Sequence, residues 1–181
     1  STRVRSSAAS DVYKRQLMIH FKSKRRSIGV REPKVFSNLN EHLAALPKVD
    51  LESRDYRYLS MAEQWSRLST RGHHKVGCVI VQKGEVVGTG FNEIKTHPFQ
   101  AKWNQFSSCL HAEMSALLSA MRVPDFQPER SVVYVSRYTK RRAVLGCSYP
   151  CRSCWSALRH VGIRRVVCYD ELDRPTKFIA E

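Results

Sequence analysis

Hydrophobic residues recur at steps of three and four along several segments, a spacing that places them on one face of a helix. An amphipathic helix is predicted before Gly72 and another before Gly162, because glycine is favoured just after a helix end. Residues 111–121 are apolar on nearly every side, so we expect a buried helix there. A short helix is expected before Pro47. The positions that carry these patterns are Leu39, Leu43 and Leu46; Tyr58, Met61, Ala62, Trp65 and Leu68; and Cys151, Cys154, Trp155, Leu158 and Val161.

Apolar, β-branched segments predict four strands. Residues 75–82 and 85–91 flank Lys83 and Gly84, a hairpin signal, so these two strands should pair antiparallel. Residues 131–137 and 164–169 predict the other two. The order helix, strand, strand, helix, strand, helix, strand indicates an α/β protein in which helices cover the faces of a mixed central sheet.

The composition favours one globular domain with a basic extension. The chain has 181 residues, 42% of them hydrophobic and 26% charged, which fits a single hydrophobic core. The net charge of +15 would attract phosphate-bearing partners. Residues 1–35 hold ten basic residues against Asp11 and Glu32, so this head carries +8 and residues 36–181 carry +7. We expect the head to be unpacked and residues 36–181 to form the domain.

The first seventeen residues resemble translated adapter sequence, with Met18 as an alternative start. No apolar run approaches the ~20 residues that a membrane helix needs. The six cysteines are unevenly spaced, which fits reduced thiols better than a disulfide scaffold. We therefore expect a cytoplasmic protein that has no contact with a membrane.

Two predicted helix starts carry residues suited to metal chemistry. Cys151 and Cys154 share one helical face at a positive helix end, which favours their thiolates. With His111 they would give zinc three protein ligands and leave a fourth position for water, the arrangement of catalytic rather than structural zinc sites. Glu113, two residues after His111, could then stand beside that water as a proton shuttle.

Other interpretations of these residues stay open at this stage. The two cysteines could form a redox pair, although that leaves His111 and Glu113 unexplained. Cys147 and His160, with Cys151 and Cys154, could instead close a structural zinc site. A non-catalytic, zinc-containing module that binds nucleic acid is the corresponding alternative function.

A His-x-Glu motif combined with a Pro-Cys-x-x-Cys motif resembles the zinc-dependent deaminases of cytidine and deoxycytidylate. The resemblance covers roughly residues 56–170 and implies a three-layer α-β-α fold, a zinc cofactor and hydrolysis of an amidine C–N bond. It assigns His111, Cys151 and Cys154 to the metal, and Glu113 to protonation of the ring nitrogen and of the leaving ammonia.

The resemblance also implies contacts to the substrate. Backbone near Ala112 would hold the pyrimidine edge, Asn92 would contact the sugar, and Tyr149 would lie against the substrate. Asn92 could alternatively be a turn residue that ends its strand. The sequence His-Ala-Glu-Met-x-Ala from His111 and the long segment before it are most similar to small phage-type deoxycytidylate deaminases.

These features predict a deaminase that converts cytosine to uracil in a nucleotide such as dCMP. Basic residues near the end of the third predicted β-strand could hold one phosphate or guide a nucleic-acid strand; they are Arg137, Lys140, Arg141 and Arg142. With Trp103, Trp155 and Tyr149 as stacking faces, deamination of cytosine or adenine in single-stranded DNA or RNA is the alternative. Either function is compatible with a homo-oligomer.

Overall fold

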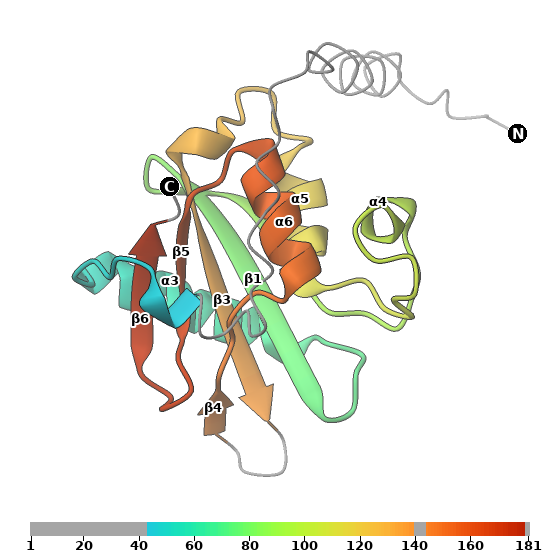
Figure 1. Ribbon diagram of the computed structural model, residues 1–181, viewed down its shortest axis with the longest axis horizontal. Helices are drawn as coiled ribbons and strands as arrows, with labels where there is room; N and C mark the ends of the chain where they lie inside the picture. Colours follow the sequence, from blue (N-terminus) through green and yellow to red (C-terminus); the bar gives the residue numbers. More distant parts are fainter. Residues whose placement is uncertain (1–42, 140–143, 180–181) are drawn as a thin grey trace, which may run out of the picture. The chain divides into compact units, whose positions relative to one another are not determined.

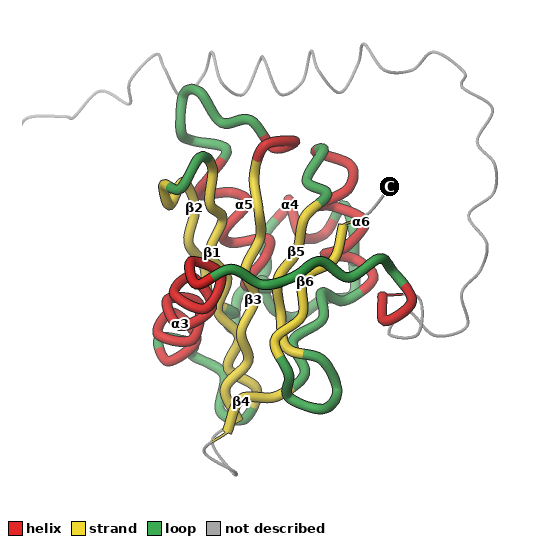
Figure 2. The backbone as a smooth tube through the Cα atoms, turned by 90° about the vertical axis from the view of Figure 1, so that its left-hand side faces the viewer, coloured by secondary structure: helices red, strands yellow, loops and turns green. Residues whose placement is uncertain are grey.

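The computed structural model describes residues 43–139 and 144–179, which form a mixed sheet between layers of helices (Figures 1 and 2). The strand order is β2-β1-β3-β5-β6, with β4 paired to the end of β3. The strands are β1 (His74–Gln82), β2 (Glu85–Phe91), β3 (Ser131–Thr139), β4 (Val144–Gly146), β5 (Arg165–Tyr169) and β6 (Pro175–Ile179). Only the β3 and β5 pair is parallel among these strands.

Helices cover both faces of the sheet, as predicted for a three-layer α-β-α fold. Alternate residues of β1 point to opposite faces, as the pleat of a strand requires. Cys78 and Ile80 pack with α5 (Ala112–Ala120) and α6 (Arg152–Val161), while Val79 and Val81 pack with α3 (Ser53–Arg67). Figure 2 shows α3 on one side of the strands and α6 on the other.

The sequence patterns located the main elements closely. The predicted hairpin is present, and Lys83 and Gly84 at its turn both have positive φ, as a two-residue type I′ turn requires. Gly162 has a φ of 107° and ends α6, where the pattern predicted the stop. The amphipathic helix expected before Gly72 ends at Arg67, with Leu68 as its C-cap.

Four elements were not predicted, and all of them are short. Helix α4 (Pro98–Ala101) is one turn, held by Pro98 and by the His97 ring nitrogen, which accepts from the Phe99 amide. The three-residue strand β4 and the edge strand β6 depend on pairing with β3 and β5. A 3₁₀ turn, η1 (Pro128–Arg130), also precedes β3.

Close approach of α5 to β2 positions the start of α5. A Cβ atom at Gly90 would lie 2.4 Å from the Ala116 amide nitrogen and 2.6 Å from the Ala112 carbonyl oxygen. Glycine is therefore the only residue that lets the first turn of α5 lie directly on the strand.

Several predictions fall on residues outside the described ranges. These are the basic head at 1–35, the first part of the short helix expected before Pro47, and Lys140, Arg141 and Arg142; residues 43–45 of that helix are helical. Among the described helices, none combines the length and the apolar character that crossing a membrane would take.

Candidate active site

The residues predicted to bind metal meet where α5 and α6 begin. His111 is the N-cap of α5 and Cys151 is the N-cap of α6, so both lie at positive helix ends. The backbone just before His111 is fixed by two hydrogen bonds between Glu93 and Leu110, of 3.0 and 3.1 Å. This bridge joins the end of β2 to the start of α5.

The three side chains form a compact donor set. The Nδ1 atom of His111 lies 3.4 Å from the Sγ atom of Cys151 and 3.4 Å from that of Cys154. Ligands of a tetrahedral zinc ion with ordinary Zn–S and Zn–N bonds lie roughly 3.5 Å apart. The separations and the chemistry of one imidazole and two thiolates therefore fit zinc, and these residues could hold the ion.

A closed structural zinc site is not supported in the described part of the chain. His111, Cys151 and Cys154 are the group of histidine, cysteine and acidic residues there that could hold a metal. His160 instead lies in the last turn of α6, edge-on to the Trp103 ring at 5.2 Å. All six cysteines are free in the structure.

The three donors differ in how readily they lose a proton when no metal is bound. Hydrogen bonds with Cys154 and then with His111 lower the pKa of Cys151 to about 4. The hydrogen bond with Cys151 in turn raises the pKa of His111 to about 9. Burial raises the pKa of Cys154, which is fully buried. One thiol thus ionises readily, and metal binding would have to release the protons of the other two groups.

Glu113 lies in the first turn of α5 with its side chain almost completely buried. Burial, followed by the negative charge of Cys151, raises the pKa of Glu113 to about 7. A carboxyl group with a pKa near neutral pH can both accept and donate a proton, which is what a proton shuttle requires. The role of Glu113 as the proton shuttle stays a prediction.

Asn92 follows β2 and is buried, and its side chain ties two strands together. Its Oδ1 accepts from the Val76 amide at 2.8 Å, and its Nδ2 donates to the His74 carbonyl at 2.7 Å. These bonds give Asn92 a structural role at the edge of the site. Its contact with a sugar stays a prediction.

The other residues predicted to contact the substrate differ in solvent exposure. Ala112 is fully buried in the first turn of α5. Tyr149 is partly exposed, packs against Phe178, and has its pKa raised to about 12 by burial. Arg137, near the end of β3, donates to the Cys147 carbonyl at 3.5 Å.

Two neighbours of the site were not found from the sequence. Gln100 in α4 accepts a hydrogen bond from the His111 amide at 3.2 Å, and Arg71 contacts the Cys109 Sγ at 2.9 Å. Neither belongs to a motif. Gln100 lies eleven residues before the zinc ligand, and only the folded loop brings the two together.

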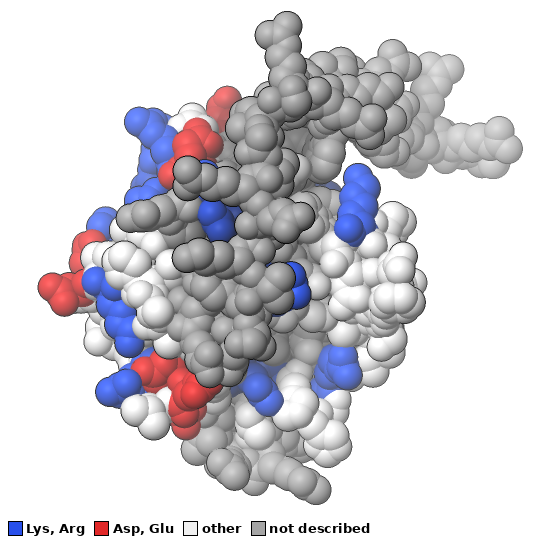
Figure 3. Space-filling view, in the orientation of Figure 1, with Lys and Arg blue, Asp and Glu red and all other residues white. Residues whose placement is uncertain are grey.

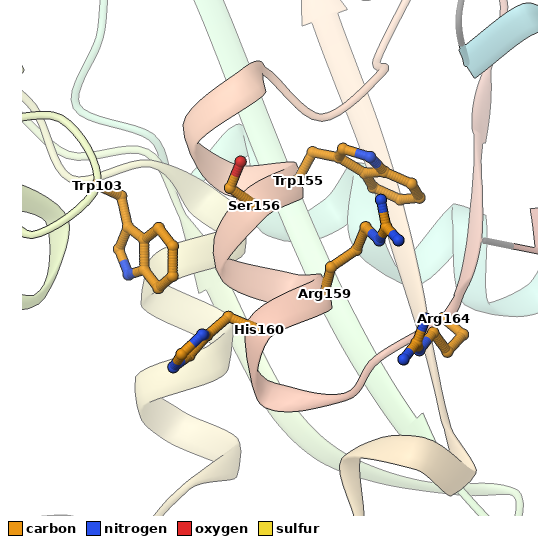
Figure 4. Close-up of a pocket in the computed structure, with 6 residues that line it drawn as sticks. All are labelled: Trp103, Trp155, Ser156, Arg159, His160 and Arg164. Atoms are coloured by element: carbon orange, nitrogen blue, oxygen red, sulfur yellow. The ribbon is translucent and has the colours of Figure 1, made fainter. Parts of the chain in front are cut away.

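A shallow pocket of about 360 Å³ lies on the outer face of α6, and none of the metal ligands lines it (Figure 4). Trp103 stands on one side of the helix, and Trp155 and Arg159 stand on the other (Figure 4). Both predicted stacking tryptophans thus belong to this pocket and not to the zinc site.

Basic side chains are dispersed on the face drawn in Figure 3. Lys and Arg are visible at several separate places on it, and Asp and Glu lie toward one side.

Comparison with known proteins agrees with this site. Residues 52–170 match the model of the cytidine and deoxycytidylate deaminase zinc-binding region. A deoxycytidylate deaminase of Schizosaccharomyces pombe is 30% identical over 155 residues, which are 72% of this chain and 44% of the relative. The chain thus spans less than half the length of that curated relative.

A solved structure shows the same fold. A cytidine deaminase from Burkholderia pseudomallei aligns with a TM-score of 0.51 at 19% identity, over 68% of this chain and 91% of that one. A dCMP deaminase from the cyanophage S-TIM5 aligns with a TM-score of 0.48 at 22% identity, over 68% and 88%.

Proposed function

The chain belongs to the cytidine and deoxycytidylate deaminase family, and from this premise we propose that it hydrolyses the amino group of cytosine in a deoxycytidine nucleotide such as dCMP. The products would be the uracil nucleotide and ammonia. The observation that carries the proposal is the meeting of three zinc-type donors with a buried carboxyl group whose pKa is about 7.

Each residue has a separate task in this proposal. His111, Cys151 and Cys154 would hold the zinc ion, which supplies a water molecule with a lowered pKa. Glu113 would accept a proton from the attacking water and pass it to the ring nitrogen, and it would then move a second proton, from the hydroxyl group added to the ring carbon, to the leaving amine. Its burial keeps bulk water away from the proton that it carries.

The remaining contacts position the substrate. The backbone of Ala112 lies beside Glu113 and would hold the pyrimidine edge. Asn92 would contact the sugar from the rim, and Tyr149 would lie against the substrate on the α6 side. The basic residues predicted around the mouth of the site, from Arg137 to Arg142, would hold the phosphate.

A binding module without catalysis is the less favoured function. A structural zinc site does not require a carboxyl group beside its ligands, and burying the carboxyl group of Glu113 costs free energy. The fourth protein ligand that would close the site is also missing from the described residues.

Release of ammonia from three substrates tests the proposal. Zinc-loaded protein is incubated with dCMP, with a cytosine-containing single-stranded DNA and with tRNA. We expect turnover of dCMP, and turnover of a polynucleotide alone would overturn the proposed substrate. Zinc content and nucleic-acid binding without any turnover would instead identify a binding module.

The Glu113→Ala variant tests the proton shuttle. We expect dCMP turnover to fall by about 10²- to 10⁴-fold, with zinc content unchanged. The matched control is Glu85→Ala, because Glu85 is exposed at the start of β2. Persistent activity in Glu113→Ala protein would show that another group moves the proton.

We also propose a cytoplasmic location, which the six free thiols support. Assembly into a homo-oligomer stays a prediction.

A further inference from the structure

The turn of chain that contains α4 contacts both of the helices that supply the metal donors. Gln100 in α4 accepts a hydrogen bond from the amide of His111, the N-cap of α5, at 3.2 Å. Trp103, three residues after Gln100, packs edge-on against His160 in the last turn of α6, with the ring centres 5.2 Å apart. Figure 4 shows both rings on the same side of α6. One turn thus connects the start of α5 with the helix that carries the two cysteine donors.

Hydrogen bonds and buried rings hold this turn in place. The amides of Trp103 and Asn104 both donate to the Gln100 carbonyl, at 3.0 and 2.9 Å. Phe99 is buried in the hydrophobic core to which α5 and α6 also contribute, and Trp103 packs against the same core. Because Gln100 and Trp103 belong to one hydrogen-bonded turn, this turn cannot move relative to one helix without changing its contact with the other.

Packing, and not a hydrogen bond, holds the ring of Trp103. Its indole nitrogen is buried and has no hydrogen-bond partner among the described residues. Burying an unpaired N–H group costs free energy, which the contacts of the large ring must offset. The contacts of the ring with His160 and with the core are therefore what keeps Trp103 in this position.

We propose that Trp103 is a positioning residue for the metal site, which fixes the distance between α5 and α6 through its contact with His160. Gln100 holds His111 at one end of the turn, and Trp103 holds α6 at the other. Donors that already stand at the right separation bind a metal more tightly, because less ordering is needed when the ion binds. The inference rests on the zinc site of the proposed function and adds Trp103 and His160 as residues that set its metal affinity.

Zinc affinity tests this role without any need for turnover. Chelator-treated protein is titrated with zinc in competition with a chromophoric chelator. We expect Trp103→Leu to lower zinc affinity about 10-fold or more, as the loss of a contact that supports metal ligands does. Trp103→Phe should recover most of the loss, because it keeps an aromatic ring against His160. Trp65→Leu is the matched control, since Trp65 stacks on Phe91 and packs with the α3 side of the sheet.

A cobalt spectrum and a double variant separate positioning from a general loss of stability. Cobalt(II) binds the same kinds of donors, and its visible spectrum reports their geometry. We expect an altered spectrum for Trp103→Leu and an unchanged one for Trp65→Leu. Combining Trp103→Leu with His160→Leu should cost less zinc affinity than the sum of the two single losses, because both changes remove the same contact. Fully additive losses would show that Trp103 does not act through His160 and would overturn the inference.

This inference and the proposed function fail in different experiments. Wild-type protein that binds zinc but does not deaminate dCMP would contradict the proposed function alone. Trp103→Leu protein that has the zinc affinity and the cobalt spectrum of the wild type would overturn the positioning role, whatever substrate the protein turns over.

Discussion

The side chain of Gln100 accepts a hydrogen bond from the amide of His111 and thereby joins helix α4 to the first residue of the metal site. Gln100 is almost completely buried, and its Nε2 atom has no partner among the described residues. A buried side-chain amide whose oxygen accepts a hydrogen bond from a backbone amide holds that backbone amide in position. We infer that α4, although it is a single turn, sets where His111 stands relative to the two cysteines.

Replacing Gln100 by methionine should weaken zinc binding. The variant keeps a similar volume and loses the acceptor, so the His111 backbone is no longer held. We expect zinc affinity to fall about 10-fold or more, measured by competition with a chromophoric chelator. Gln82→Met is the matched control, because Gln82 is also buried and bonds to the Gln127 amide, remote from the site. Equal zinc affinities in the two variants would contradict the positioning role.

The sequence predicted the elements whose patterns are local. Glycine stops, a two-residue hairpin turn and apolar periodicity place α6 and the first two strands almost to the residue, while α3 starts and ends about five residues earlier than its pattern indicated. The metal donors were predictable for a related reason, since each stands at a helix start that the pattern already marked. The prediction that these donors lie close together came from the family resemblance and not from periodicity.

Other features depend on contacts between distant segments. Strand β6 forms because it pairs with β5, and α4 is stabilised by Pro98 and by the His97 cap. Arg71 and Gln100 reach the site only through loops, so no spacing in the sequence marks them. The buried pair of Asp55 and Tyr134, which are 79 residues apart, was missed for the same reason.

Asp55 and Tyr134 should contribute measurably to stability. The buried carboxylate of Asp55 accepts from the Tyr134 hydroxyl at 2.7 Å and from Lys177 at 3.1 Å, which ties α3 to β3 and β6. Tyr134→Phe removes one donor from a buried charge, so we expect the free energy of unfolding to fall by about 1.5–3 kcal/mol. Urea denaturation at pH 7 measures this. Tyr56→Phe, at an exposed position of α3, should change it little.

The same carboxylate predicts loss of stability in acid. Burial alone would raise the pKa of Asp55, but hydrogen bonds from the Glu52 amide, Tyr134 and Lys177 together lower it. Because the pKa is lowered, the stabilisation that the ionised Asp55 carboxylate gives the folded state is complete above the ordinary pKa near 3.8. It disappears as the pH falls through the pKa of the folded protein. Urea denaturation of Asp55→Asn protein should thus show less stability than wild type at pH 7 and a smaller difference at pH 3. A difference that does not change with pH would contradict this.

Gly90→Ala should displace the start of α5. The added methyl group would meet backbone atoms of Ala112 and Ala116 at 2.4–2.6 Å, and backbone cannot move aside without shifting the helix. We expect a loss of about 1–3 kcal/mol in the free energy of unfolding, together with weaker zinc binding, because His111 caps this helix. Gly72→Ala is the control, since nothing lies within 4 Å of its added Cβ. Wild-type zinc affinity in Gly90→Ala protein would show that the helix start is free to move.

Glu113 should make the metal-free protein less stable as the pH rises. Burial raises its pKa from 4.5 to about 7, so the folded state binds a proton that the unfolded state releases. The stabilisation is complete below about pH 4.5 and is lost as the pH rises through 7, because the carboxylate must then ionise in a buried site. Glu113→Gln cannot ionise, so its stability relative to wild type should increase between pH 5 and pH 8. Chelator-treated samples of both proteins are unfolded in urea at each pH. A difference between the two proteins that stays constant with pH would show that Glu113 is already ionised in the folded state at pH 5.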